Sequence, residues 1–188
     1  MPIPNLTPAQ IAQVSDLVAQ YISAQRKEFS SRAHALSAKQ KTALSGFFTE
    51  PVLENTRILE LPSGERVPNP DFYPTLKEWG FDNLPDQSGM GAITFSDVVV
   101  SHEPFSSGLL FHELVHVEQY RLLGIPRFSE LYVCGFINGG SYEAIPLEVN
   151  AYTLEDRYRT NPTRRFSVSE EVQQWHAQGK LQKIWWRR

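Results

Sequence analysis

Two histidines and a glutamate stand at a spacing that can bind and use a metal ion. The segment HELVH covers residues 112–116, with His112 and His116 four positions apart and Glu113 directly after the first. On a helix, residues four apart lie on the same face, so both imidazoles can bind one ion. The neighbouring carboxylate can then accept a proton from a water molecule at the metal. The pattern therefore predicts metal-dependent hydrolysis with Glu113 as general base.

A catalytic zinc ion usually has three protein ligands, so the rest of the chain must supply one more. The longer histidine patterns HExxHxxGxxH and HxxEH are both absent. We expect ordinary polar roles for the remaining histidines, which are His34, His102 and His176.

A glutamate on a later helix is the remaining source of a third ligand. Glu148 stands 32 positions after His116, in the first turn of a helix that Pro146 is placed to begin. The small Ala151 would let the two helices approach closely. Glu148 is therefore the predicted third ligand, and Glu143, which precedes the helix, is the alternative.

The elements around the motif predict an α+β fold that is mostly helical with a small sheet. Ser106 or Ser107 can cap a helix over 108–123, and Gly124 and Pro126 form its stop signal. A loop that contains Gly135, Gly139 and Gly140 is expected after it. The β-branched segment 92–101 predicts one strand, and 56–61 a shorter one. Further helices are predicted over 8–29, 37–47 and 146–158 and after residue 167, with irregular structure over 68–91.

Length and composition indicate one globular domain. The chain has 188 residues, of which 41% are hydrophobic and 21% charged. We divide it into a helical N-terminal extension (1–55), a catalytic core (56–160) and a basic C-terminal helix (161–188). No apolar run reaches the ~20 residues of a membrane span, so no integral membrane segment is expected. The net charge of −3 argues against a nucleic-acid-binding protein.

The charge is distributed unevenly along the chain. Residues 1–156 carry 10 Lys and Arg against 19 Asp and Glu, whereas residues 157–188 carry 8 against 2. This basic tail also contains Trp175, Trp185 and Trp186. It can pack on the domain, or it can dock on a protein partner or an anionic surface. The single Cys134 and the absence of a cleavable secretory signal favour the cytoplasm, or export by another route.

The stretch from 92 to 158 resembles the DUF4157 group of bacterial metallopeptidase-like proteins. The similar features are the strand ITFSDVVVS, the helix FHELVHVEQYRLLG with Phe128 and Tyr132 after it, and the later segment YEAIPLEVNAY. The chain is similar, more distantly, to the gluzincins, in which a glutamate on the helix after the motif helix is the third zinc ligand. The resemblance covers roughly a third of the chain and is most specific around 110–125 and 142–152.

The resemblance implies a zincin-like fold in which His112, His116 and Glu148 bind Zn²⁺. Many gluzincins carry an aspartate a few residues after the third ligand that orients a histidine; Tyr152 stands at the corresponding place here, so that role stays open. In proteases similar to lethal factor, a tyrosine before the glutamate stabilises the oxyanion. Tyr142 is the first candidate for that catalytic role and Tyr152 the second.

The function we expect is zinc-dependent hydrolysis of peptide bonds in a peptide or protein substrate, by an endopeptidase. The edge of strand 92–101 can pair with an extended peptide, unless the segment 62–91 covers it. Three alternatives remain: a non-catalytic zinc-binding scaffold or assembly component, a secreted effector with peptidase activity, and an amidase that acts on other amides.

Overall fold

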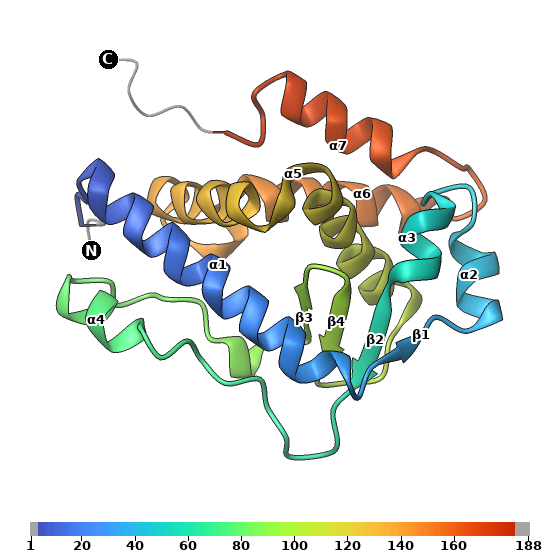
Figure 1. The fold of residues 1–188 in the computed structure, drawn as a ribbon. Helices are drawn as coiled ribbons and strands as arrows, with labels where there is room; N and C mark the ends of the chain where they lie inside the picture. Colours follow the sequence, from blue (N-terminus) through green and yellow to red (C-terminus); the bar gives the residue numbers. More distant parts are fainter. Residues whose placement is uncertain (1–3, 183–188) are drawn as a thin grey trace.

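The computed structural model describes residues 4–182 and shows a mixed α+β fold with long helices and a four-stranded sheet (Figure 1). In the N-terminal half the elements are α1 (Pro8–Ser30), β1 (His34–Ala35), α2 (Ala38–Leu44), α3 (Glu50–Asn55), β2 (Arg57–Glu60), α4 (Tyr73–Glu78) and the 3₁₀ turn η1 (Gln87–Gly89). They are followed by β3 (Ala92–Phe95), β4 (Val98–Ser101), α5 (Ser107–Gly139), the 3₁₀ turn η2 (Tyr142–Ala144), α6 (Pro146–Thr160) and α7 (Val168–Ala177).

The first two helices begin at capping boxes, as the sequence predicts. The Thr7 hydroxyl accepts a hydrogen bond from the Gln10 N–H, and the Gln10 side chain accepts one from the Thr7 N–H. Ser37 and Gln40 form the same pair at the start of α2. Each box satisfies backbone donors that have no partner inside the helix, which fixes where the helix starts.

The sheet has the order β1-β2-β4-β3, with β2 parallel to β4 and the other pairs antiparallel. The prediction of one strand over 92–101 is wrong, because the chain reverses at Ser96 and Asp97 and forms a hairpin. Ser96 has a φ of 64°, and Asp97 binds the Arg26 guanidinium of α1 through both carboxylate oxygens. The reversal makes β3 an edge strand of the sheet.

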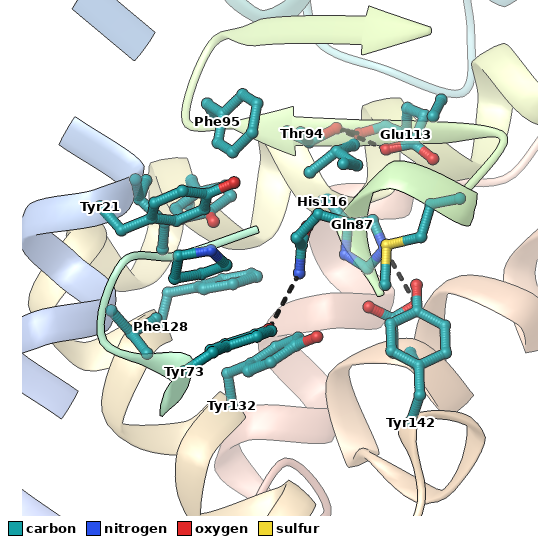
Figure 2. Close-up of a pocket in the computed structure, with 18 of the residues that line it drawn as sticks. Tyr21, Tyr73, Gln87, Thr94, Phe95, Glu113, His116, Phe128, Tyr132 and Tyr142 are labelled. Atoms are coloured by element: carbon teal, nitrogen blue, oxygen red, sulfur yellow. Dashed lines mark hydrogen bonds and ion pairs between the residues drawn. The ribbon is translucent and has the colours of Figure 1, made fainter. Parts of the chain in front are cut away.

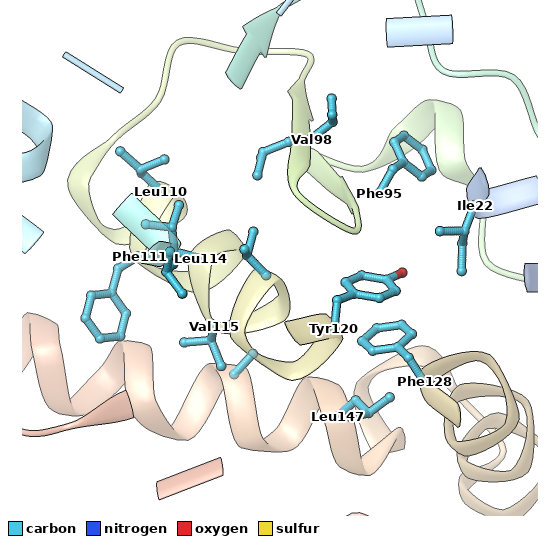
Figure 3. Close-up of a cluster of buried hydrophobic side chains, with 14 of the residues drawn as sticks. Ile22, Phe95, Val98, Leu110, Phe111, Leu114, Val115, Tyr120, Phe128 and Leu147 are labelled. Carbon is cyan, nitrogen blue, oxygen red and sulfur yellow. The ribbon is translucent and has the colours of Figure 1, made fainter. Parts of the chain in front are cut away.

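The motif helix α5 lies at the centre of the molecule. The Ser106 hydroxyl accepts a hydrogen bond from the Leu109 N–H at its start. Its first turns are buried on nearly every side, and apolar residues such as Leu114 and Val115 lie between Val98 of the sheet and α6 (Figure 3). A helix enclosed in this way holds polar groups at fixed positions.

The stop predicted at Gly124 is a kink, after which α5 continues to Gly139. Gly124 has a φ of 72°, and Pro126 stands at the start of the resumed helix, where a missing N–H costs little. The loop predicted around Gly135, Gly139 and Gly140 is therefore wrong as far as Gly139, and the helix ends at its C-cap Gly140. Gly135 and Gly139 are glycines for a reason of packing, because the segment 144–146 passes very close to this part of the helix. A Cβ on Gly135 would lie 2.7 Å from Cδ of Pro146, and one on Gly139 would lie 2.6 Å from Cβ of Ala144.

The predicted helix over 146–158 is present as α6, and its Ala151 is fully buried against α5. The last helix begins at the predicted cap, where the Ser167 hydroxyl accepts a hydrogen bond from the Glu170 N–H. A basic helix over 161–188 stays a prediction, because residues 183–188 lie outside the described part of the chain. Helix α7 ends at Ala177, carries Glu170 and Glu171 in its first turn, and contains no lysine or arginine.

The arginines around α7 contact groups of the same chain. The guanidinium of Arg157 lies over the Phe166 ring and binds Glu171, and that of Arg165 lies over the Phe47 ring. Trp175 packs against the hydrophobic core, whereas Trp185 and Trp186 lie outside the described residues. A docking role for the tail stays a prediction.

A single cluster of buried hydrophobic side chains runs from Val14 to Leu181 and includes both faces of the sheet region and α5. Within the described residues, no helix combines the length and the hydrophobicity that crossing a membrane requires. The 1–55 segment contributes α1, which packs along α5. The boundaries drawn from the sequence between extension, core and tail stay a prediction.

Candidate metal centre

Three side chains from α5 and α6 converge on one point inside the protein. The Nε2 atoms of His112 and His116 are 3.1 Å apart, and Oε2 of Glu148 lies 3.5 Å from the first and 3.3 Å from the second. All three side chains are buried. The predicted ligands on two separate helices are therefore brought together into a group that could hold a metal ion.

The spacing of these atoms is that of three corners of a tetrahedron. For metal–ligand distances of about 2.0–2.1 Å, neighbouring ligand atoms of a tetrahedral site are about 3.3 Å apart. The three measured separations, 3.1, 3.3 and 3.5 Å, bracket that value. An ion can therefore be placed without moving the helices.

The outer nitrogen of each imidazole is held by a hydrogen bond. Nδ1 of His112 lies 3.2 Å from Oε2 of Glu155, and Nδ1 of His116 lies 2.8 Å from Oε1 of Gln119. Both partners are acceptors, so each Nδ1 is the donor. Each Nε2 can then present its lone pair toward the centre, which is the form that binds a metal.

The amide of Gln119 has only one orientation that fits its surroundings. Its nitrogen donates to the carbonyl of Leu147 and to Oδ1 of Asn150, at 3.0 and 2.9 Å. The oxygen must therefore face His116. Because both acceptors belong to α6, this amide also links α5 to α6, the helix that carries Glu148.

The electrostatics of the group favour a positive charge at its centre. Burial lowers the pKa of His112, but its interactions with the carboxylates of Glu148 and Glu155 outweigh burial and raise this pKa to about 10. Burial likewise raises the pKa of Glu148, and the two imidazoles outweigh it, so the net shift is downward. Oε2 of Glu148 is fully enclosed and has no aligned hydrogen-bond donor. A proton or a metal ion would satisfy this oxygen.

Glu113, the predicted base, lies beside this group and is oriented by the sheet. The Thr94 hydroxyl of β3 lies 2.7 Å from Oε2 of Glu113 and donates to it. The Glu113 side chain is buried, yet it borders two cavities. The inner cavity also touches His116 and Glu148, and the outer cavity touches His112 and Glu155.

The two candidate tyrosines occupy different places around the centre. Tyr142 borders both cavities and points into the inner one (Figure 2). Burial, followed by the charge of Glu148, raises its pKa well above the ordinary value, so its hydroxyl stays a donor at neutral pH. Tyr152 is 45% exposed and lies against the outside of His112, with ring centroids 4.5 Å apart.

The alternatives considered from the sequence lie elsewhere. Glu143 is exposed in η2 and is not part of the buried group. His102 donates from Nδ1 to the carbonyl of Met90 and accepts at Nε2 from the Val67 N–H, which is a structural role. His34 is exposed in β1, and His176 lies in the last turn of α7.

Three polar residues of the site escaped the sequence reasoning: Thr94, Gln119 and Glu155. Glu155 carried a usable signal, because it stands two helical turns after Glu148 and so faces the same side of α6. Gln119 stands three positions after His116 on the motif helix, which is also the same face. Thr94 gave no signal, since its contact depends on how β3 packs against α5.

No model of a protein family matches this sequence, and comparisons with curated proteins and with solved structures likewise give no match.

Proposed function

We propose that this protein is a zinc-dependent peptidase. The observation that carries the proposal is the convergence of His112 Nε2, His116 Nε2 and Glu148 Oε2 at tetrahedral spacing, with the carboxylate of Glu113 in the same cavity. Two imidazoles and one carboxylate are the donor set of hydrolytic zinc sites, which leave the fourth position open. The resemblance of 92–158 to the DUF4157 group and to the gluzincins supports the same choice of metal.

When bound, zinc supplies Lewis acidity that lowers the pKa of a water molecule and polarises a carbonyl group. The residues around it do the remaining work. Glu113 accepts the proton of the attacking water and returns it to the leaving amine. Thr94 holds one oxygen of Glu113 and thereby orients the other. The Tyr142 hydroxyl, kept protonated, donates to the oxygen that becomes negative during attack.

The edge of β3 offers a binding place for the substrate backbone. All four residues of β3 border the inner cavity, and β4 occupies only the other edge of this strand. An extended peptide can add to such an edge through main-chain hydrogen bonds. The segment 68–91 reaches the same cavity through Pro70, Tyr73 and Gln87, so it forms a wall of the cavity along the edge.

The test compares the wild type with Glu113→Gln on a mixed peptide library, read by mass spectrometry. We expect the wild type to cleave peptide bonds, to lose activity with a chelator and to regain it with zinc. Glu113→Gln should keep its zinc and lose activity by at least about a hundredfold, the size of a general-base contribution. Glu130→Gln is the control, because Glu130 is on the same helix but in an exposed ion pair with Arg127.

Two results would contradict the proposal. Equal activity in Glu113→Gln and the wild type would show that Glu113 is not the catalytic base. A zinc-loaded wild type that leaves every peptide intact would favour the scaffold alternative.

A further inference from the structure

The inner cavity has two chemically different ends. At one end lie Glu113, His116 and Glu148. The rest of the lining consists mainly of aromatic and aliphatic side chains from α1, β3 and the second half of α5, together with the amide of Gln87. The hydroxyls of Tyr21 and Tyr73 donate to the carbonyls of Pro68 and Pro85. Figure 2 shows Glu113 and Tyr142 on one side of the cavity and the rings of Phe95 and Phe128 on the other. A substrate side chain bound at the apolar end therefore lies next to Glu113 and the candidate metal ligands.

The apolar end offers no partner for a charged group. Among residues 4–182, apart from the three at the metal end, no Asp, Glu, Lys, Arg or His borders this cavity. The tyrosines there stay neutral, since burial raises the pKa of Tyr21 and raises that of Tyr73 to about 12. Burying a charge without a partner is strongly unfavourable. This end of the cavity therefore selects an uncharged group.

The size of the cavity limits which uncharged side chains can enter it. Its volume, with the metal end included, is about 90 Å³. An apolar cavity of about 150 Å³ holds one benzene molecule, so an aromatic side chain is too large for this one. The walls are fixed by ring packing: Tyr120 stacks on Phe128 at 3.7 Å, and Tyr21 meets Phe95 edge to face at 5.9 Å. Side chains such as valine, leucine and methionine remain.

We propose that the inner cavity is a specificity pocket for an uncharged aliphatic side chain, of valine to leucine or methionine size, on the residue beside the cleaved bond. This inference rests on the proposed peptidase function. A peptide paired along β3 turns alternate side chains to opposite faces, so one of them can enter the cavity that β3 borders. The pocket is completed by α1 and by the segment 68–91, both outside the part of the chain that resembles metallopeptidases.

Val18 is the residue through which this selectivity can be tested. It is half-buried on α1, borders the apolar end, and makes no hydrogen bond through its side chain. Val18→Phe should fill the pocket, and Val18→Ala should enlarge it. Leu17→Phe is the matched control, because Leu17 is a half-buried neighbour on the same helix that does not border the cavity.

The experiment uses one peptide frame in which a single residue beside the cleaved bond is alanine, valine, leucine, methionine, phenylalanine, lysine or aspartate. We expect kcat/KM for valine, leucine and methionine to exceed that for phenylalanine, lysine and aspartate by about tenfold or more. Val18→Phe should lower the value for leucine by about tenfold relative to alanine, and Val18→Ala should raise that for phenylalanine. Leu17→Phe should leave the order unchanged. Circular dichroism and zinc content verify that each variant is folded.

A second measurement separates this inference from the proposed function. The same peptides are titrated against zinc-loaded Glu113→Gln, and their binding should follow the same order. A flat order, a preference for aromatic or charged side chains, or an order that Val18 variants leave unchanged would overturn the pocket while the peptidase function stands. If the wild type cleaves none of the peptides, the function fails, and the binding order still decides whether the pocket selects as inferred.

Discussion

Glu155 and Gln119 decide how the two imidazoles face the centre, because each holds the outer nitrogen of one ring. Neither was identified from the sequence, since Glu155 lies 43 positions after His112 and meets it only when α6 crosses α5. The motif itself was readable because His112, Glu113 and His116 depend on the helical repeat alone. Glu148 was readable from the helix start that Pro146 marks. Partners that depend on the crossing of two helices were not.

Replacement of Glu155 by alanine should weaken metal binding. Without this acceptor, Nδ1 of His112 loses the hydrogen bond that fixes its ring, and loss of such a partner typically lowers affinity by about 10–100-fold. The measurement is competition with a chromophoric chelator. Glu143→Ala is the control, because Glu143 borders the outer cavity but is not part of the buried group. Similar affinities for Glu155→Ala and Glu143→Ala would show that the hydrogen bond does not matter.

Metal binding should release protons at pH 7. In the metal-free protein the pKa of His112 is raised to about 10 and that of His116 is raised as well, so at pH 7 the group holds a proton. A metal ligand must be deprotonated, so the ion displaces that proton. Affinity should therefore rise with pH, by about tenfold per pH unit for each proton displaced, until the pH reaches the pKa of His112. Calorimetry in buffers of different ionisation enthalpy counts the protons, and a count of zero would contradict the account.

At the scale of elements, the position of Glu148 depends on how closely the chain before α6 passes α5. Gly139→Ala adds a Cβ that would lie 2.6 Å from Cβ and 2.9 Å from the carbonyl oxygen of Ala144. The backbone before α6 must then move, and Glu148 moves with it. We expect the variant to lose about tenfold or more in metal affinity while its circular dichroism spectrum stays helical.

Gly89→Ala serves as the comparison for Gly139→Ala. The added Cβ would there meet only the side chain of Asp86, at 3.2 Å, which can turn away. Metal affinity should therefore stay at the wild-type value. If Gly139→Ala also binds metal like the wild type, the close passage does not set the position of Glu148.

The sequence predicted the elements whose signals are local. Capping boxes at Thr7 and Ser37, the cap at Ser106 and the proline at position 146 each mark a helix start that the structure confirms. The prediction failed where a tertiary contact determines the local structure against the usual preference of a residue type. Gly135, Gly139 and Gly140 indicate a loop, yet the first two are in a helix because the segment 144–146 packs closely against them. A β-branched run favours a strand, but the two-residue turn at Ser96 and Asp97 divides this run into two strands.

At the scale of the whole molecule, the centre joins the motif helix, the sheet through Thr94 and helix α6. Metal binding should therefore stabilise the entire fold. An ion at a hundred times its dissociation constant adds about 2.7 kcal/mol, which raises the Tm of a chain of this size by about 5–10 °C. Differential scanning fluorimetry with and without a chelator measures the shift. Glu148→Ala should show only a small shift in Tm. An unchanged Tm of the wild type on binding metal would contradict this coupling.

The most direct test of the central claim is the zinc content per chain by elemental analysis, for the wild type beside Glu148→Ala, Glu143→Ala and Glu113→Gln. The account predicts one zinc per chain in the wild type, in Glu143→Ala and in Glu113→Gln, and a strongly reduced content in Glu148→Ala. Full occupancy in Glu148→Ala would mean that another group is the third ligand. A wild type that binds no metal after zinc is added would contradict the metal centre, and with it the proposed function.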